Sequence, residues 1–213
     1  MNWEAAILWF VTFVLSTTVH EAAHATFAML GGDRTALEGG QVTLNPLPHM
    51  QREPFGMVML PLLSLWMSGA NWCFGYASTP YNPIWAYRHP KRAALMSAAG
   101  PLANVLLAAI AFAVLYFVGR PDGGTEEAVR RIAGTFLLLN LLLAVFNLIP
   151  LPPLDGAGVV QGLLPKTRGL YETIQRIPYA GIVTFVLLIK ILPYLFWPVY
   201  STVNGWLPYP YRG

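Results

Sequence analysis

Long apolar runs separated by short polar stretches dominate the chain. A helix that crosses the hydrocarbon core of a bilayer needs about 20 such residues. Four runs are long enough, namely Trp3 to Leu30, Ala93 to Val118, Ile132 to Pro150 and Ile177 to Pro198. The last run is interrupted by Lys190 and Pro193. The pattern therefore predicts four spanning helices.

A fifth apolar run, Phe55 to Trp72, is shorter and contains Pro61. Such a segment either spans the membrane or folds back to the side from which it entered. Before it, residues Gly39 to Pro46 alternate briefly between apolar and polar side chains, which predicts a short strand or hairpin at the membrane surface. The expected fold class is an all-α polytopic membrane protein with four to five spanning helices, a re-entrant segment and this surface strand or hairpin.

Composition agrees with a membrane protein. Hydrophobic residues make up 55% of the chain and charged residues 11%, whereas a soluble domain carries about 25% charge. The net charge of +3 is too small to indicate a nucleic-acid partner. The 213 residues suit one membrane-embedded domain, 1–213, with a core at 11–164 and a C-terminal helix and aromatic tail at 177–213.

The single cysteine and the N-terminal segment each exclude one feature. Cys73 is the only cysteine, so the chain can form neither an intrachain disulfide nor a multi-cysteine zinc site. We expect Cys73 to be a small packed residue. The segment before the first apolar run carries no basic residue, which argues against a cleaved signal peptide.

Three ionisable residues lie close together near the end of the first run, in the stretch VHEAAHA. Such residues are costly in a spanning helix and indicate function. His20 and His24 are four residues apart, so they share one helix face and both rings can reach one zinc ion. Glu21 then lies beside the metal as a general base toward water. The alternative is a polar cluster that joins helices through hydrogen bonds.

A catalytic zinc ion usually has three protein ligands, so a third residue is required. Glu4, Glu126 and Glu127 lie far from the histidines in any plausible layout. His49 and Glu53, in the polar stretch after the first run, stay chemically possible.

Asp155 is the most suggestive third ligand because of the chain that leads to it. In NLIPLPPLDG, three prolines follow a spanning helix, so the helix must unwind after Ile149. Non-helical backbone at membrane depth is tolerated only where it is buried in protein or lines a wet cavity. An extended segment that ends at Asp155 and Gly156 can bend the aspartate toward the histidines.

Three motifs occur in order: HEAAH at 20–24, GPLAN at 100–104 and NLIPLPPLDG at 147–156. Together they resemble the site-2 protease family of intramembrane zinc metalloproteases, in its compact bacterial branch without PDZ or CBS domains. The resemblance implies that His20, His24 and Asp155 bind one zinc ion per chain and that Glu21 is the catalytic base. It also implies that Asn147 helps to hold the substrate or the oxyanion.

The metal-site hypothesis makes a demand on topology, because the ends of the first and third long runs must lie on the same side of the membrane. This holds if Phe55 to Trp72 is re-entrant and fails if it spans, so we expect it to be re-entrant. The inner segments then carry eight Lys and Arg residues and the outer segments four, as cytoplasmic loops require. The active site is expected near the cytoplasmic face of the bacterial inner membrane.

The expected function is zinc-dependent intramembrane proteolysis of transmembrane segments, with a membrane-protein substrate and the lipid bilayer as partners. The substrate would pair edge to edge with a strand at Gly40 to Leu44. Two alternatives stay open. One is an ion or proton transporter that uses the His, Glu and Asp side chains and binds no stoichiometric zinc. The other is a catalytically silent family member that only binds membrane helices.

Several further residues have two readings. Asn104 either reaches the site or joins helices through hydrogen bonds, and Asn140 is expected to serve packing. Small residues between Ser97 and Ala108 are expected to pack against the histidine helix. Lys190 is expected to extend its amine toward the membrane surface. An interfacial aromatic belt is predicted for Trp197, Tyr200, Trp206, Tyr209 and Tyr211.

Overall fold

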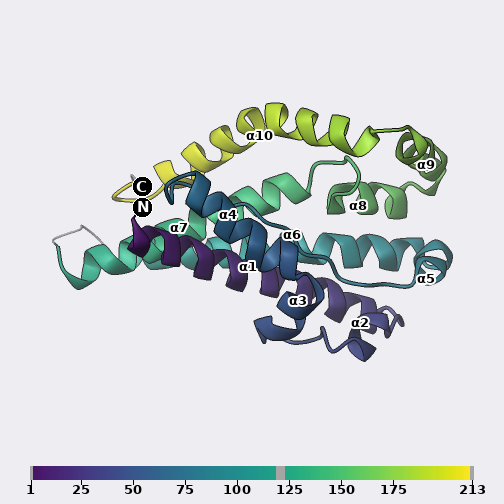
Figure 1. The fold of residues 1–213 in the computed structure, drawn as a ribbon, viewed down its shortest axis with the longest axis horizontal. Coiled ribbons are helices and arrows are strands. Elements are labelled where there is room, and N and C mark those ends of the chain that lie inside the picture. Colours follow the sequence, from purple (N-terminus) through teal and green to yellow (C-terminus); the bar gives the residue numbers. More distant parts are fainter. Residues whose placement is uncertain (1, 119–122, 212–213) are drawn as a thin grey trace.

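The computed structural model describes residues 2–118 and 123–211, which form a helical bundle (Figure 1). Four of its helices are long and apolar enough to cross a membrane. They are α1 (Trp3–Leu30), α6 (Pro90–Val118), α7 (Thr125–Asn147) and α10 (Ala180–Gly205). Each corresponds to one of the four predicted runs, so the all-α polytopic fold is confirmed.

Helices α1, α6 and α7 form the centre of the bundle, with α6 in contact with both of the others. The buried face of α6 is made mostly of small residues, including Ala94, Ala99, Gly100 and Ala108. Small side chains let helix backbones approach closely where no water drives association. The predicted packing of this face against the histidine helix is therefore confirmed.

Helix α10 lies on the outside and packs mainly against α7. Phe196 and Tyr200 join a buried cluster with Leu115 and Leu137. Tyr200 is thus a core residue, contrary to its predicted place in an interfacial aromatic belt. Its ring stacks on Phe196, which removes it from the surface. Trp197 on α10 and Trp206, which follows the end of that helix, belong to the same predicted belt and are exposed.

The fifth apolar run folds back, as the topology argument requires. A π-helix, η1 (Phe55–Met59), continues into α4 (Leu60–Met67), and at about 1.5 Å per residue this piece is too short for a 30 Å core. Residues 71–82 then return without regular structure toward α5 (Pro83–Arg88). Tyr76 donates its backbone N–H to the carbonyl of Gly56 at 3.1 Å, which ties the two limbs of this hairpin together.

The predicted strand or hairpin at 39–46 is wrong. After α2 (Thr35–Glu38) the chain turns at Gly40, whose φ of +70° suits glycine, and bends to Asn45. The Asn45 side chain then accepts the N–H of Leu47 and caps α3 (Pro46–Arg52). Among the described residues no segment pairs with this stretch, so its alternation produces no ladder.

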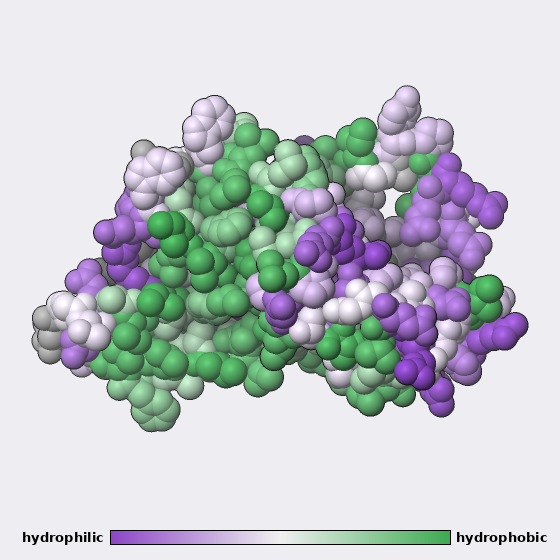
Figure 2. All heavy atoms as spheres, turned by 60° about the horizontal axis from the view of Figure 1, so that its bottom comes forward, coloured by the Kyte–Doolittle hydropathy of each residue, from purple (hydrophilic) through white to green (hydrophobic). Residues whose placement is uncertain are grey.

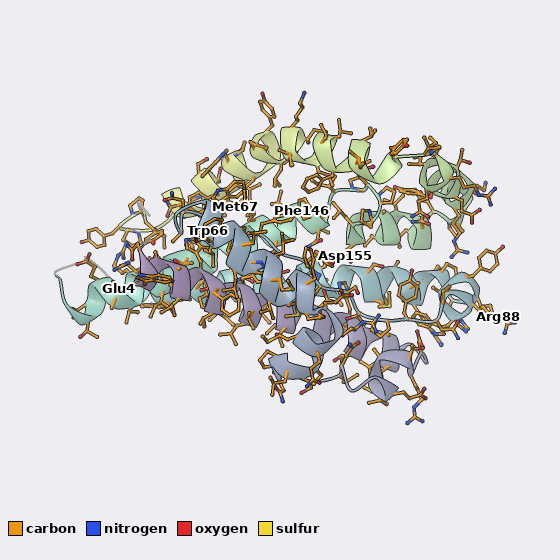
Figure 3. All side chains as sticks on the ribbon, viewed as in Figure 1. Glu4, Trp66, Met67, Arg88, Phe146 and Asp155 are labelled. Atoms are coloured by element: carbon orange, nitrogen blue, oxygen red, sulfur yellow. The ribbon has the colours of Figure 1, made fainter. Side chains whose placement is uncertain are left out.

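Three further short elements follow α7. They are α8 (Asp155–Leu163), the 3-10 turn η2 (Pro165–Thr167) and α9 (Arg168–Arg176). Helix α8 packs against α6, and α9 leads into α10. The face in Figure 2 is broadly apolar, and hydrophilic side chains gather toward the end of the bundle that carries α5 and α9. Arg88, labelled in Figure 3, lies at this end.

Candidate metal centre

Two distant parts of the chain converge on one point inside the bundle. Helix α1 supplies His20 and His24. The first turn of α8 supplies Asp155, which is labelled in Figure 3. The Nε2 atoms of the two histidines are 3.0 Å apart. Asp155 places Oδ2 3.1 Å from His20 Nε2 and Oδ1 3.3 Å from His24 Nε2. The structure thus brings together the three residues predicted as metal ligands.

The other nitrogen of each imidazole is held by an oxygen acceptor. His24 Nδ1 donates to the backbone carbonyl of Met96 at 2.7 Å. His20 Nδ1 donates to Oδ1 of Asn104 at 2.5 Å. A ring that carries its proton on Nδ1 leaves the Nε2 lone pair free. Nε2 is therefore the atom that each histidine can offer to a metal ion.

The three side chains fit a zinc ion. Ligand atoms about 2.0–2.2 Å from a tetrahedral zinc ion lie roughly 3.3–3.5 Å from one another, close to the spacing of these groups. Oδ2 of Asp155 is buried and has no hydrogen-bond partner in the described parts of the chain. Burial acts to raise the pKa of Asp155, but the His24 and His20 imidazoles hold that pKa well below its usual range. The carboxylate is therefore ionised, as a ligand must be.

Gly100 leaves the room that this cluster needs. It lies on α6 within the GPLAN motif, and a Cβ built on it would overlap the Nε2 atoms of both His20 and His24. Any side chain at this position would displace the rings from their meeting point. The glycine is thus explained by the close approach of α6 to the two imidazoles.

Glu21 lies next to the cluster and lines the same cavity, with only 4% of its surface exposed. Its carboxylate accepts a hydrogen bond from Oγ1 of Thr79 at 2.7 Å. Thr79 belongs to the returning limb of the hairpin and was not predicted as a site residue. Nothing local in the sequence indicates it, because its partner is 58 positions away.

The cavity has a volume of about 640 Å³ and is bounded by several elements. The irregular limb from Cys73 to Thr79 forms one wall, and Pro152 to Asp155 form another. Asn147, the last residue of α7, also lines it. The prediction that the chain unwinds after this helix and carries Asp155 toward the histidines is confirmed.

Cys73 lines the cavity without taking part in the cluster. Only 8% of its surface is exposed, as predicted for a packed residue. Burial raises the pKa of its thiol to about 12. The thiol is therefore protonated at neutral pH and is a poor metal ligand.

The other candidates for a third ligand lie elsewhere. His49 is buried on α3, where its Nε2 donates to the carbonyl of Thr43 at 3.0 Å. Glu53 accepts a hydrogen bond from Ser78. Glu4 is exposed and lies 3.8 Å from Arg131. Glu126 and Glu127 are exposed in the first turn of α7.

Asn104 and Asn140 both belong to the surroundings of the site. Nδ2 of Asn104 donates to Oδ1 of Asn140 at 2.8 Å, while Oδ1 of Asn104 contacts His20. Of the two readings of Asn104, the structure favours the one that reaches the site. Asn140 is more than a packing residue, because it contacts the residue that holds His20.

Comparison with known proteins agrees with this geometry. The model of peptidase family M50 matches residues 123–189. The chain is 34% identical over 196 residues to the Bacillus subtilis (strain 168) protein named "Putative zinc metalloprotease YwhC", covering 89% of this chain and 84% of that protein. It is 30% identical over 167 residues to "Putative zinc metalloprotease Rip2" of Mycolicibacterium smegmatis, covering 76% of this chain and 60% of that protein. No solved structure gives a significant match.

The fold, the site and these relatives together define the class, a membrane metalloprotease whose metal is zinc. The chain belongs to peptidase family M50, the site-2 protease family.

Proposed function

We propose that this protein is a zinc-dependent endopeptidase that cuts its substrates within the membrane. One observation carries the proposal: two imidazoles and a carboxylate meet beside Glu21, in a cavity enclosed by helices long enough to span a bilayer. A polar site of this kind is costly inside a spanning helix and is retained where it serves function.

In this proposal His20, His24 and Asp155 hold one zinc ion, and Glu21 and Asn147 act on the reacting groups. Zinc, when bound, supplies a Lewis acid that polarises a peptide carbonyl and lowers the pKa of water. Glu21 accepts a proton from the attacking water and returns it to the departing amine. Thr79 orients the Glu21 carboxylate through its 2.7 Å hydrogen bond.

Asn147 is assigned the role of a hydrogen-bond donor toward the substrate. It lines the cavity at the point where α7 ends, so its amide is carried by a rigid helix. A donor fixed in this way stabilises the negative charge that develops on a peptide oxygen, or binds the substrate backbone.

The substrate is a transmembrane segment that unwinds locally, because helical peptide bonds are shielded by their own hydrogen bonds. The irregular limb from Cys73 to Thr79 is the segment suited to bind it. In the described parts of the chain, the backbone N–H and C=O groups of Ala77 and Thr79 form no hydrogen bond with other backbone groups, so they are free to pair with an extended peptide. The predicted segment Gly40 to Leu44 has no strand geometry and does not line the cavity.

This substrate-binding role predicts opposite results for two proline variants. Ala77→Pro removes a backbone donor beside the cavity and should lower cleavage of a reconstituted transmembrane substrate about tenfold or more, with zinc content unchanged. Val42→Pro is the matched control and should cleave at the wild-type rate. Equal rates for both variants would exclude Cys73 to Thr79 as the binding limb.

We infer that the cavity opens toward the cytoplasmic side of a bacterial inner membrane. Exposed basic residues gather at the end of the bundle that carries α5 and α9, among them Arg88, Lys91 and Arg92. Cytoplasmic segments carry the excess of lysine and arginine. Labelling of single cysteines placed at Arg88 and at Glu4 in intact cells tests this, since only the second should react with an impermeant reagent.

Metal content tests the proposed function directly. The protein, purified in mild detergent, should contain about one zinc ion per chain by mass spectrometry. His24→Ala and Asp155→Ala should lose it, whereas Glu21→Gln should keep it. Zinc that is indifferent to Asp155 would contradict the site. Ion flux in liposomes without bound zinc would favour a transporter, and zinc without cleavage of any membrane substrate would favour a silent family member.

A further inference from the structure

Three fully buried polar side chains connect His20 to the rest of the bundle. Asn104 on α6, Asn140 on α7 and Ser16 on α1 each expose 0% of their surface. Asn140 Nδ2 donates to Ser16 Oγ at 2.9 Å, and Asn104 Nδ2 donates to Asn140 Oδ1 at 2.8 Å. Because Ser16 lies one turn before His20 on the same helix, these hydrogen bonds and one turn of α1 together close a ring through three spanning helices.

The direction of these hydrogen bonds is anchored at a backbone carbonyl. Asn140 Nδ2 also donates to the carbonyl of Phe136 at 2.9 Å, and a carbonyl can only accept. The amide of Asn140 must therefore turn its Oδ1 toward Asn104. Asn104 in turn must present Nδ2 to Asn140 and Oδ1 to His20. The only ring proton that suits this oxygen is the one on Nδ1.

We propose that Asn140 is a positioning residue for the metal centre. Acting through Asn104, it keeps the His20 proton on Nδ1 and so leaves Nε2 as the metal-binding atom. The inference rests on the proposed zinc site. Asn140 itself contacts neither the cluster nor the cavity, so its effect passes entirely through the orientation of one amide.

The physical reason is the symmetry of the Asn104 amide. Its oxygen and nitrogen ends have nearly the same shape, and only their hydrogen-bond partners distinguish them. Without Asn140 Oδ1, Asn104 can rotate and offer Nδ2 to His20. A donor at that point favours the ring form with a proton on Nε2, and that nitrogen then has no lone pair to offer the metal. In a dry interior an unmet hydrogen-bond donor is costly, so a fixed partner decides the orientation.

His24 provides the contrast within the same site. Its Nδ1 donates to the Met96 backbone carbonyl, which cannot rotate to present a donor. The orientation of His24 therefore needs no further side chain. Only His20 depends on a relay, and the relay has one amide that can turn.

Zinc affinity of the purified apo-protein, measured by competition with a chelator in detergent, tests this inference without any assay of cleavage. Asn140→Leu should weaken zinc binding by about 10–100-fold, the range found when partners of metal-binding histidines are removed. Asn140→Asp should bind within about threefold of the wild type, because it keeps an oxygen acceptor for Asn104 whether or not it is protonated. Thr135→Val, which removes a different, partly buried hydrogen bond of α7, is the matched control and should bind normally.

A double variant separates positioning from general support. If Asn140 acts only through Asn104, then adding Asn140→Leu to Asn104→Leu should cause no further loss of zinc affinity. Ser16→Ala should have the smallest effect, because Asn140 still has the Phe136 carbonyl. Additive losses in the double variant, or wild-type affinity in Asn140→Leu, would overturn the inference.

The controls keep the two proposals apart. Absence of zinc from the wild-type protein would contradict the proposed function. Zinc in the wild type with full affinity in Asn140→Leu would contradict only the relay. If Asn140→Leu does not fold, Asn140→Ser takes its place and should also bind zinc more weakly than Asn140→Asp, with melting temperatures recorded for every apo-variant.

Discussion

Helices α1 and α10 are both long enough to span a membrane and both mainly apolar, yet α1 is enclosed by other helices and α10 is largely exposed. Of the most apolar 18-residue window in each, 56% is buried for α1 and 17% for α10. The enclosed helix carries buried polar residues such as Ser16, His20 and His24, whereas α10 carries one charged side chain, Lys190, which is exposed.

The difference shows what determines enclosure inside a membrane. Lipid is as apolar as leucine, so apolar side chains gain little by leaving it. Polar groups must find partners, and those partners lie on neighbouring helices. Helix α1 is therefore surrounded because of its few hydrophilic residues, and α10 can stay on the outside.

The largest effect is expected at Glu21, the buried carboxylate of α1. Glu21→Gln keeps the shape of the side chain but removes the proton acceptor. It should lower the rate of substrate cleavage about 10²–10⁴-fold while zinc content stays unchanged. A variant that retains the wild-type rate would show that another group accepts the proton.

A second test adds one methyl group to α6, beside the histidines of α1, and one methyl group to α10. Gly100→Ala places a Cβ against the Nε2 atoms of His20 and His24 and should weaken zinc binding at least tenfold. Gly205→Ala on α10 meets no atom within 4 Å and should leave zinc affinity unchanged. Chelator competition measures both. Equal affinity for the two variants would mean that α6 can move away from the rings at little cost.

A third test sharpens the comparison within α10. Leu188 is 2% exposed and Ile189 is 56% exposed, although they are neighbours in the sequence. Leu188→Ala should lower the free energy of unfolding by about 1–3 kcal/mol through lost packing, whereas Ile189→Ala should change it by less than about 0.5 kcal/mol. Denaturation in detergent measures the two values. Similar losses would mean that α10 is more enclosed than its exposure indicates.

The smallest effect is expected at Lys190. Its amine is exposed and the packing of α10 does not involve it, so Lys190→Met should change neither zinc content nor cleavage rate. The free energy of unfolding should shift by less than about 0.5 kcal/mol. A large loss of cleavage would instead place this lysine among the residues that contact the substrate.

Much of this fold could be predicted from the sequence, because most of the signals were local patterns. One further signal was the requirement that the three ligands meet on one side of the membrane. Apolar length located the four spanning helices. The spacing of His20 and His24 placed them on one face, and the prolines before Asp155 ended α7. The need for these groups to meet then required that Phe55 to Trp72 fold back, which the hairpin of α4 confirms.

Other features could not be predicted, because they depend on which helices become neighbours. Asn104 and Asn140 have no local feature that distinguishes a relay from simple helix contacts. Thr79 meets Glu21 only through the path of the returning limb. The alternation at 39–46 predicted a strand, but a strand needs a partner segment, and the Asn45 cap favoured a helix instead.

The ligands of the proposed centre are supplied early and late in the chain. His20 and His24 are synthesised first, and Asp155 follows only after α6 and α7. During synthesis the first helix therefore enters the membrane with two imidazoles and no third ligand, and the relay residues arrive with the next two helices. A growing chain does not contain all three ligands until Asp155 has been synthesised, so the incomplete chain cannot form the proposed centre. The proposed metal centre can therefore form only when most of the bundle has been made.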